Sequence, residues 1–108
     1  MAAETHNLLV ATDGREVVGF VHAMMEEVKE HSHFRERRFV TINMLGVRKD
    51  HRHSGIGTQL MRSISEWALK AGIREIELTV WKYNRSAIAF YDSLGYRTIN
   101  RKLRKEFR

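Results

Sequence analysis

The chain has 108 residues, a length that suits one domain with a single hydrophobic core. Hydrophobic residues make up 43% of it and charged residues 30%, a balance typical of globular proteins, and no apolar run approaches the length of a membrane span. Because cysteine is absent, disulfides, thiolate metal sites and a cysteine nucleophile are excluded. We therefore predict a single domain over residues 1–108. Since residues 1–7 lack a signal-peptide pattern, we expect a cytoplasmic location.

The net charge of +6 has two interpretations, a surface for nucleic acid or an attraction for an anionic ligand. Much of the excess lies in the terminal segment Arg101–Arg108, where no aromatic platform is interleaved with the charges. A charged terminal strand more often forms a solvated sheet edge that discourages aggregation. We therefore favour the anionic ligand and expect neither a nucleic-acid nor a membrane partner.

The first half of the chain predicts a hairpin followed by a third strand. Residues 8–11 and 17–25 are apolar runs on either side of Asp13-Gly14, which is a strong hairpin turn signal. Residues 26–36 form a charged, histidine-containing segment that we expect to be a loop. Residues 39–47 then show the pattern of a strand.

The second half alternates helices with strands. From Gly57 onward, apolar residues recur on one helical face until Gly72, which suits the C′ position of a helix. Residues 76–80 alternate as in a strand, and Asn84 suits the N-cap of a second helix that ends at Gly95. Residues 96–107 are predicted to form a final strand. Helices that join neighbouring strands predict an α/β domain whose mixed sheet is covered on at least one face.

The stretch Arg52–Thr58 is the most informative feature, because it places a glycine-rich turn between a strand and a helix. Such a turn directs backbone N–H groups and the positive end of the helix dipole to one point, which suits a phosphate or pyrophosphate. Gly55 and Gly57 lack the Cβ atoms that would hold a ligand away. The dinucleotide fingerprint would need a glycine at Leu60, and the P-loop needs a Gly-Lys-Ser/Thr tripeptide that the chain lacks. A tight turn that only packs the helix on the sheet is the alternative.

The turn reads Arg-x-x-Gly-x-Gly, and residues 84–96 read Asn-x-x-Ala-x-x-Phe-Tyr-x-x-x-Gly-Tyr after one intervening helix and strand. In this order the two segments resemble the signatures of the GNAT superfamily of N-acetyltransferases. The resemblance covers nearly the whole chain, which starts at what looks like the family's second strand. It implies an N-terminally shortened GNAT-like fold, with acetyl-CoA as co-substrate and no metal.

By this resemblance, the acetyl group passes directly from acetyl-CoA to a primary amine. In the family the fourth strand bulges and splays from the fifth, pantetheine lies between them, and a backbone N–H polarises the thioester carbonyl. Tyr91 matches the tyrosine that protonates the leaving thiolate and is the predicted catalytic residue, although a core tyrosine on the apolar helix face would look the same. Gly46 suits a bulge or a close backbone approach. The residues implied in cofactor binding are Leu45, Gly46, Val47, Arg52, His53, Ser54, Gly55, Ile56, Gly57, Thr58, Asn84 and Tyr91.

The sequence does not decide which residue acts as the general base. The family often carries a glutamate where this chain has Asn43. Glu26, Glu27 and His22 are candidates that would act through water, and a solvated surface group is the alternative for each.

The histidines give only a weak metal signal. The pairs His31/His33 and His51/His53 lack an accompanying carboxylate pattern, so we expect no metal site. His51 and His53 are instead expected to flank the pyrophosphate.

Three functions follow in order of preference: an acetyl-CoA-dependent N-acetyltransferase, a catalytically impaired acyl-CoA-binding regulatory module, and a small basic nucleic-acid-binding domain. Asn43 and the absent N-terminal wall favour the second, whereas Tyr91 favours the first. The absent wall also leaves an open sheet edge with apolar residues such as Leu8, Leu9 and Val10. We therefore expect a homodimer, or a longer parent chain that completes the fold. The acceptor amine is not readable from the sequence.

Overall fold

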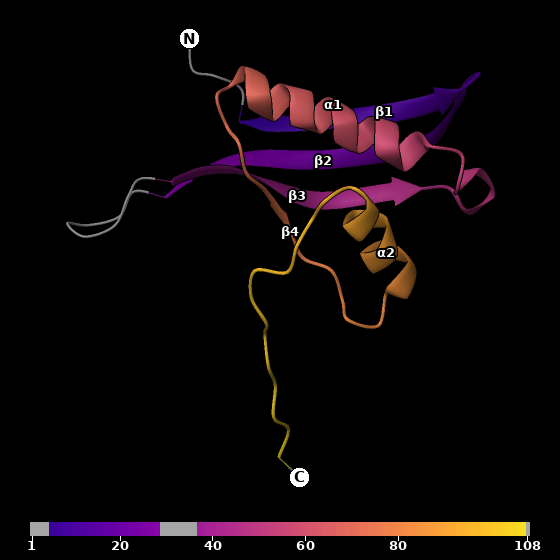
Figure 1. Cartoon of the computed structure of the whole chain (residues 1–108). Coiled ribbons are helices and arrows are strands. Elements are labelled where there is room, and N and C mark those ends of the chain that lie inside the picture. The colour runs from indigo at the N-terminus through magenta and orange to yellow at the C-terminus, as the bar shows by residue number, and fades with distance from the viewer. Residues whose placement is uncertain (1–4, 29–36, 108) are drawn as a thin grey trace.

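The structure is a computed structural model that describes residues 5–28 and 37–107. Its elements, in chain order, are β1 (His6–Asp13), β2 (Glu16–Val28), β3 (Arg37–Val47), the short 3-10 helix η1 (Lys49–His51), α1 (Ile56–Lys70), β4 (Ile76–Leu78) and α2 (Arg85–Ser93) (Figure 1). Among the described residues, no helix is long and apolar enough to cross a membrane.

The four strands form one mixed sheet in the order β1-β2-β3-β4. β1 pairs with β2 and β2 with β3 in antiparallel fashion, whereas β3 and β4 are parallel because α1 connects them. Gly14 supplies the positive φ, 62°, that the hairpin turn requires. The predicted α/β class and mixed sheet are confirmed.

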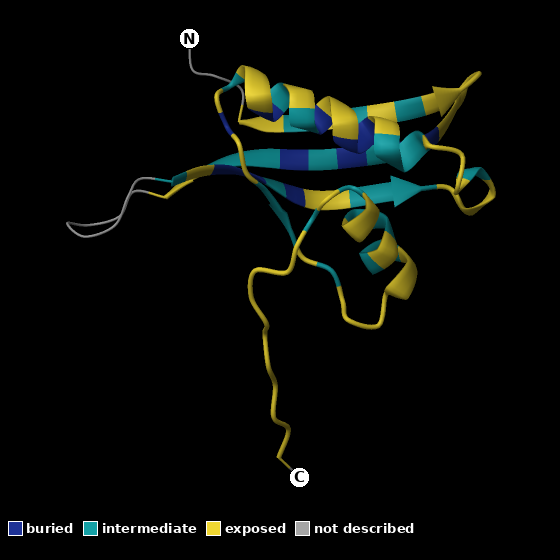
Figure 2. Cartoon of the chain, in the orientation of Figure 1, coloured by how far each residue is buried: buried dark blue, intermediate teal, exposed yellow. Residues whose placement is uncertain are grey.

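α1 lies across one face of this sheet and supplies much of the core (Figure 1). The dark blue segments of α1 in Figure 2 face dark blue segments of β2 and β3. Burying a large aliphatic side chain contributes roughly 1.5–3 kcal/mol, so this interface accounts for most of the fold's hydrophobic stabilisation. The residues that make it are Leu60, Met61, Ile64 and Ala68 of α1 and Val21, Ala23, Val40 and Ile42 of the strands.

β3 carries a bulge, but not at the glycine suggested by the sequence. The β2–β3 register places His22 opposite Met44 and Ala23 opposite Ile42, so that Asn43 is the extra residue. Gly46 is instead a close approach, because a Cβ atom there would lie 2.7 Å from a ring carbon of Phe20. The bulge predicted at Gly46 is therefore wrong, and its missing side chain leaves room for the Phe20 ring.

The boundaries of several strands differ from the prediction. β2 extends through Val28, so that residues 26–28 belong to a strand rather than a loop, while residues 29–36 lie outside the described residues. β4 is shorter than predicted and ends at Leu78.

The final predicted strand is wrong. Residues 97–107 are exposed and leave the domain without pairing to any described strand (Figure 1; yellow in Figure 2). Apolar residues recur in the segment only at every fourth position, and Ile99, Leu103 and Phe107 stay 70%, 88% and 84% exposed. A strand needs a partner edge, and this spacing does not supply one.

Candidate functional site

The site begins where β3 separates from β4. Their parallel pairing runs only from Val40 opposite Ile76 to Ile42 opposite Leu78, where β4 ends. β3 continues through residues 43–47, which pair with β2 on one side. On their other side, no described strand pairs with them. The bulge lies at the start of this free edge, which therefore offers unpaired backbone groups to a ligand.

Ion pairs join β3 to β4 and the segment before it at the Arg37 end of β3. Arg37 Nη2 donates to Glu75 Oε2 at 2.7 Å and also to Glu77. The guanidinium lowers the pKa of Glu75, and both carboxylates raise the pKa of Arg37. Partly exposed pairs of this kind contribute little each to stability. Their position nevertheless favours separation of the strands toward Val47 rather than toward Arg37.

A glycine-containing turn follows the free edge and opens into α1. Its backbone is left-handed at His53 and Gly55, whose φ values are 64° and 88°. Gly55 is the N-cap of α1, and no side chain caps this helix. The first intrahelical bond runs from Gln59 N–H to the Gly55 carbonyl at 3.0 Å, so the N–H groups of residues 56–58 have no partner within the helix. Such N–H groups, with the helix dipole behind them, favour an anion.

Side chains of the turn fold back on its own backbone. Arg52 Nε donates to the carbonyl of Val47 at 3.2 Å, and Ser54 Oγ donates to the carbonyl of His51. Both side chains belong to exposed residues. The turn is thus held to the end of β3, with the Arg52 guanidinium beside the free strand edge.

The glycines of the turn have different roles. A Cβ atom at Gly55 would meet nothing within 4 Å, so Gly55 serves the left-handed backbone. A Cβ atom at Gly57 would lie 3.2 Å from Phe90 Cζ of α2. Gly57 therefore has a packing role between the two helices, and its role in leaving space for a ligand stays a prediction.

His51 lies within a group of carboxylates. Its Nδ1 is 2.9 Å from Asp50 Oδ1 and its Nε2 is 3.1 Å from Asp13 Oδ2. Hydrogen bonds to Asp50 and then Asp13 raise the pKa of His51, while the bond from His51 lowers the pKa of Asp50. Both ring nitrogens of His51 thus lie within hydrogen-bond distance of carboxylates, and its predicted place beside the pyrophosphate stays a prediction.

α2 carries the second signature. The predicted N-cap is confirmed, because Asn84 Oδ1 accepts a hydrogen bond from Ala87 N–H at 3.2 Å. Tyr91 is half-buried and packs edge-to-face on Phe90 and Tyr96, with centroid distances of 5.2 Å and 5.6 Å. Burial raises the pKa of Tyr91, and burial together with the neighbouring Tyr91 raises the pKa of Tyr96 to about 12. Both phenols therefore remain protonated at neutral pH.

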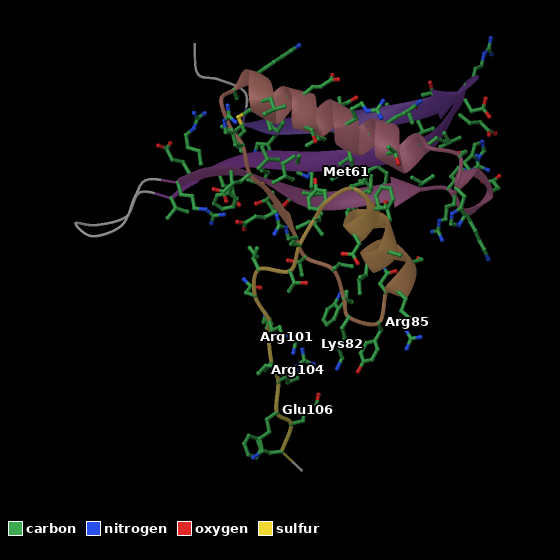
Figure 3. All side chains as sticks on the ribbon, in the orientation of Figure 1. Met61, Lys82, Arg85, Arg101, Arg104 and Glu106 are labelled. Carbon is green, nitrogen blue, oxygen red and sulfur yellow. The ribbon has the colours of Figure 1, made fainter. Side chains whose placement is uncertain are left out.

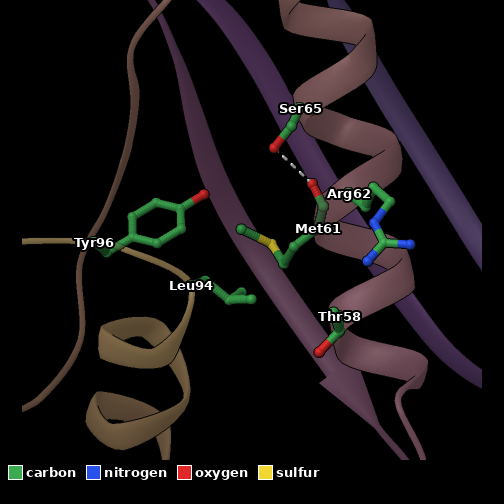
Figure 4. A pocket seen from close by; sticks show the side chains of 6 residues that line it. All are labelled: Thr58, Met61, Arg62, Ser65, Leu94 and Tyr96. Carbon is green, nitrogen blue, oxygen red and sulfur yellow. Dashed lines mark hydrogen bonds between the residues drawn. The ribbon is translucent and has the colours of Figure 1, made fainter.

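Two hollows flank these elements. The larger, of about 360 Å³, borders two of the predicted cofactor residues and is lined by Val17, Val18, Gly19, Phe20, Gly46, Val47 and Arg48. The smaller, of about 130 Å³, lies between α1 and α2, where the Met61 side chain extends toward Tyr96 (Figure 4). It is lined by Thr58, Met61, Arg62, Ser65, Leu94 and Tyr96. The larger hollow thus lies over the paired ends of β2 and β3.

The candidate bases differ in their surroundings. His22 Nδ1 lies 3.3 Å from Asn43 Nδ2 at the bulge, and its ring stacks on His6 with 5.5 Å between centroids. Glu26 accepts a hydrogen bond from the hydroxyl of Thr41. His22 is thus the candidate nearest the bulge. His6 was not identified from the sequence, although the hairpin register, which pairs Leu8 with His22, would have placed His6 near it.

The comparisons with known proteins agree with this geometry. The model of the acetyltransferase (GNAT) family matches residues 2–96. The chain belongs to the GNAT family. Among curated GNAT relatives, it is 32% identical to acetyl transferase GW6a of Oryza sativa subsp. japonica over 92% of its length, and 40% identical to an uncharacterised N-acetyltransferase of Methanocaldococcus jannaschii over 60%. It spans only 26% and 29% of those two proteins.

Solved structures share the GNAT fold. A tetramutant of the BH1408 protein from Bacillus halodurans matches 96% of the chain with a TM-score of 0.90 and 27% identity, and the match covers 67% of that protein. The aminoglycoside N-acetyltransferase AAC(6')-Iy in complex with CoA matches 98% of the chain and 78% of its own, with a TM-score of 0.83 and 19% identity. The chain thus spans 67% of the first of these solved chains and 78% of the second.

Proposed function

We propose that this domain binds acetyl-CoA and transfers its acetyl group to a primary amine of an acceptor. One observation carries the proposal: the unpaired edge of β3, residues 43–47, leads directly to an uncapped helix N-terminus. A free strand edge suits the amides of pantetheine, and an uncapped N-terminus suits a pyrophosphate. A ligand that carries both groups in sequence is coenzyme A.

The binding residues follow from that track. Backbone groups of Leu45, Gly46 and Val47 would pair with pantetheine, and the N–H groups of residues 53–58 would hold the pyrophosphate, with Arg52 adding charge. Asn84 would bond the cofactor in addition to capping α2. The roles of these residues are part of the proposal.

Acetyl-CoA supplies an acetyl group activated as a thioester. In the transfer, the C–N bond to the amine forms, the C–S bond breaks, and the amine nitrogen gives up one proton to water. A backbone N–H of the free β3 edge would stabilise the negative charge that develops on the carbonyl oxygen. Tyr91, whose burial raises its pKa, would hold the proton that the leaving thiolate takes up.

Named relatives support an amine acceptor. One curated relative, 29% identical over 57% of the chain, is a thialysine N-epsilon-acetyltransferase of Sus scrofa. The structural neighbour AAC(6')-Iy has also been solved in complex with a bisubstrate analogue of CoA and acetylneamine. These acceptors differ from each other, so we propose the amine class and no individual acceptor.

We also propose that the domain forms a homodimer. β1 and β4 are the outer strands of the sheet, and Leu8 and Val10 of β1 are 63% and 54% exposed. Open edges and exposed apolar groups favour association.

Calorimetric titration with coenzyme A and with pantetheine tests the binding site. Arg52→Ala should weaken coenzyme A binding by about tenfold, because a charge-assisted bond to phosphate is lost. Pantetheine, which lacks the pyrophosphate, should bind the variant and the parent protein equally. Arg74→Ala is the matched control, since Arg74 is exposed at the other end of α1. Equal coenzyme A affinity in Arg52→Ala and the parent protein would refute this assignment of the phosphate site.

Turnover distinguishes the enzyme from an acyl-CoA-binding module. Acetyl-CoA consumption should rise when the protein meets a suitable member of a panel of small amines, aminoglycosides and lysine peptides. Coenzyme A binding without turnover on any amine would favour the module.

A further inference from the structure

Polar side chains tie the tip of the β1–β2 hairpin to the segment before α1. His51 is central, because Nδ1 lies 2.9 Å from Asp50 and Nε2 lies 3.1 Å from Asp13, the last residue of β1. Arg48 makes a second link, donating to Glu16 of β2 at 2.9 Å and to Asp50 at 3.1 Å. The hairpin tip is therefore attached to this segment by two adjoining ion-pair contacts.

The main chain of His51 continues the connection into the phosphate turn. Its carbonyl accepts the hydroxyl of Ser54, which directly precedes the N-cap Gly55. The next residue, Arg52, returns to the carbonyl of Val47. The ring of His51 thus contacts the hairpin and its carbonyl contacts the helix N-terminus. Only 23% of its side chain is exposed, against 61% and 73% for the two aspartates that it contacts.

Both contacts of the ring require the protonated form. A neutral imidazole has one N–H and one lone pair, so it donates to one carboxylate while its lone pair faces the other. Asp50 and Asp13 raise the pKa of His51 above its ordinary value. The proton is therefore lost only as the pH rises through that raised pKa, and one of the two contacts is lost with it.

We propose that His51 is a positioning residue for the coenzyme A pyrophosphate, which holds the turn at residues 52–55 to the hairpin tip through both ring contacts when protonated and holds it less firmly when neutral. This proposal rests on the proposed function. Coenzyme A then binds best below the pKa of His51 and more weakly above it. The charged groups near the ring are Asp13 from β1, Glu16 from β2 through Arg48, and Lys49, Asp50 and Arg52 along the segment itself.

Coenzyme A affinity as a function of pH tests the proposal. From about pH 6 to about pH 9, the parent protein should lose roughly fivefold or more in affinity through the His51 titration. His51→Gln keeps a neutral donor that reaches toward Asp13 but does not titrate in this range. The ratio of its Kd to that of the parent should therefore fall as pH rises. Ionisation of coenzyme A itself cancels in this ratio.

Asp13→Asn gives a signature that a purely structural role would not produce. It keeps an oxygen acceptor but removes one charge beside His51, so the pH at which affinity falls should move lower. NMR titration of the His51 ring measures the same pKa without ligand. By thermodynamic linkage, bound coenzyme A should raise the pKa of His51. The rise equals the logarithm of the ratio of coenzyme A affinities for the protonated and the neutral form.

Lys70→Gln is the control, since Lys70 is an exposed cation at the C-terminal end of α1 and its loss should leave the pH profile unchanged. If the parent protein binds no coenzyme A, the proposed function fails and this inference with it. If it binds coenzyme A, but His51→Gln and Asp13→Asn keep the parent pH profile, or coenzyme A leaves the His51 pKa unchanged, the role of His51 alone is overturned.

Discussion

At the scale of the residue, Tyr91 is the side chain that we propose as the proton donor in turnover. Its phenol is half-buried on α2 and burial raises its pKa, so it is protonated at working pH. Tyr91→Phe should lower kcat on the order of 10²-fold and leave acetyl-CoA affinity nearly unchanged, because a proton donor acts in the transition state. Steady-state kinetics with a reactive amine, beside calorimetric affinity, measures both.

Tyr96→Phe is the matched control for this change. Tyr96 packs on Tyr91 at 5.6 Å but lines the hollow between the helices. Loss of the Tyr96 hydroxyl should therefore leave kcat close to that of the parent protein. An unchanged kcat in Tyr91→Phe, with the chemical step shown to limit the rate, would remove Tyr91 from the mechanism.

At the scale of the element, Gly57 controls how closely α1 and α2 approach. A side chain there would meet the Phe90 ring, so Gly57→Val should lower the free energy of unfolding by about 1–3 kcal/mol through overpacking. Phe90→Leu should relieve part of that loss, so that the two substitutions are non-additive. Denaturant unfolding of the single and double variants measures the coupling.

Gly55→Ala separates backbone strain from packing. Gly55 has a φ of 88° and open space around its Cβ position, so its substitution should destabilise through the backbone alone. Phe90→Leu should give no relief in that background. If Phe90→Leu changes the unfolding free energy of both glycine variants equally, the contact between Gly57 and Phe90 does not cause the destabilisation in Gly57→Val.

At the scale of the whole molecule, the C-terminal segment determines the shape. The radius of gyration is 16.1 Å, whereas a compact chain of this length would have about 13 Å. The side chains labelled in Figure 3 on this segment, Arg101, Arg104 and Glu106, extend into solvent. Between them lie Leu103 and, further along, Phe107, both over 80% exposed. Apolar groups in that position favour contact with a second copy of the chain.

We therefore expect light scattering to report a dimer at micromolar concentration. Leu8→Asp with Val10→Asp should shift it toward monomer if the β1 edge forms the interface, and Ile99→Asp with Leu103→Asp should do so if the tail forms it. Leu69→Asp is the control, since Leu69 is a single exposed apolar residue on α1, 61% accessible. A parent protein that stays monomeric and still binds coenzyme A would contradict the homodimer.

The sequence by itself determined the features that depend on neighbours in the chain. The 3.6-residue spacing of apolar side chains predicted α1, and the cap at Asn84 predicted the start of α2, because both signals act within one helical turn. The glycine-rich turn between strand and helix was also readable, since its left-handed backbone at Gly55 favours glycine. These local signals, in their order along the chain, were enough to indicate the GNAT family.

Only the tertiary structure decided what depends on pairing between distant segments. The end of β4 at Leu78 and the bulge at Asn43 define the free edge of β3, and both follow from strand register rather than from composition. Asp13 and His51 are 38 positions apart, and no local pattern indicates that their side chains meet. The tail at residues 97–107 was predicted to be a strand but pairs with no described strand. A strand exists only where a second strand satisfies its backbone, and that condition is set by the fold as a whole.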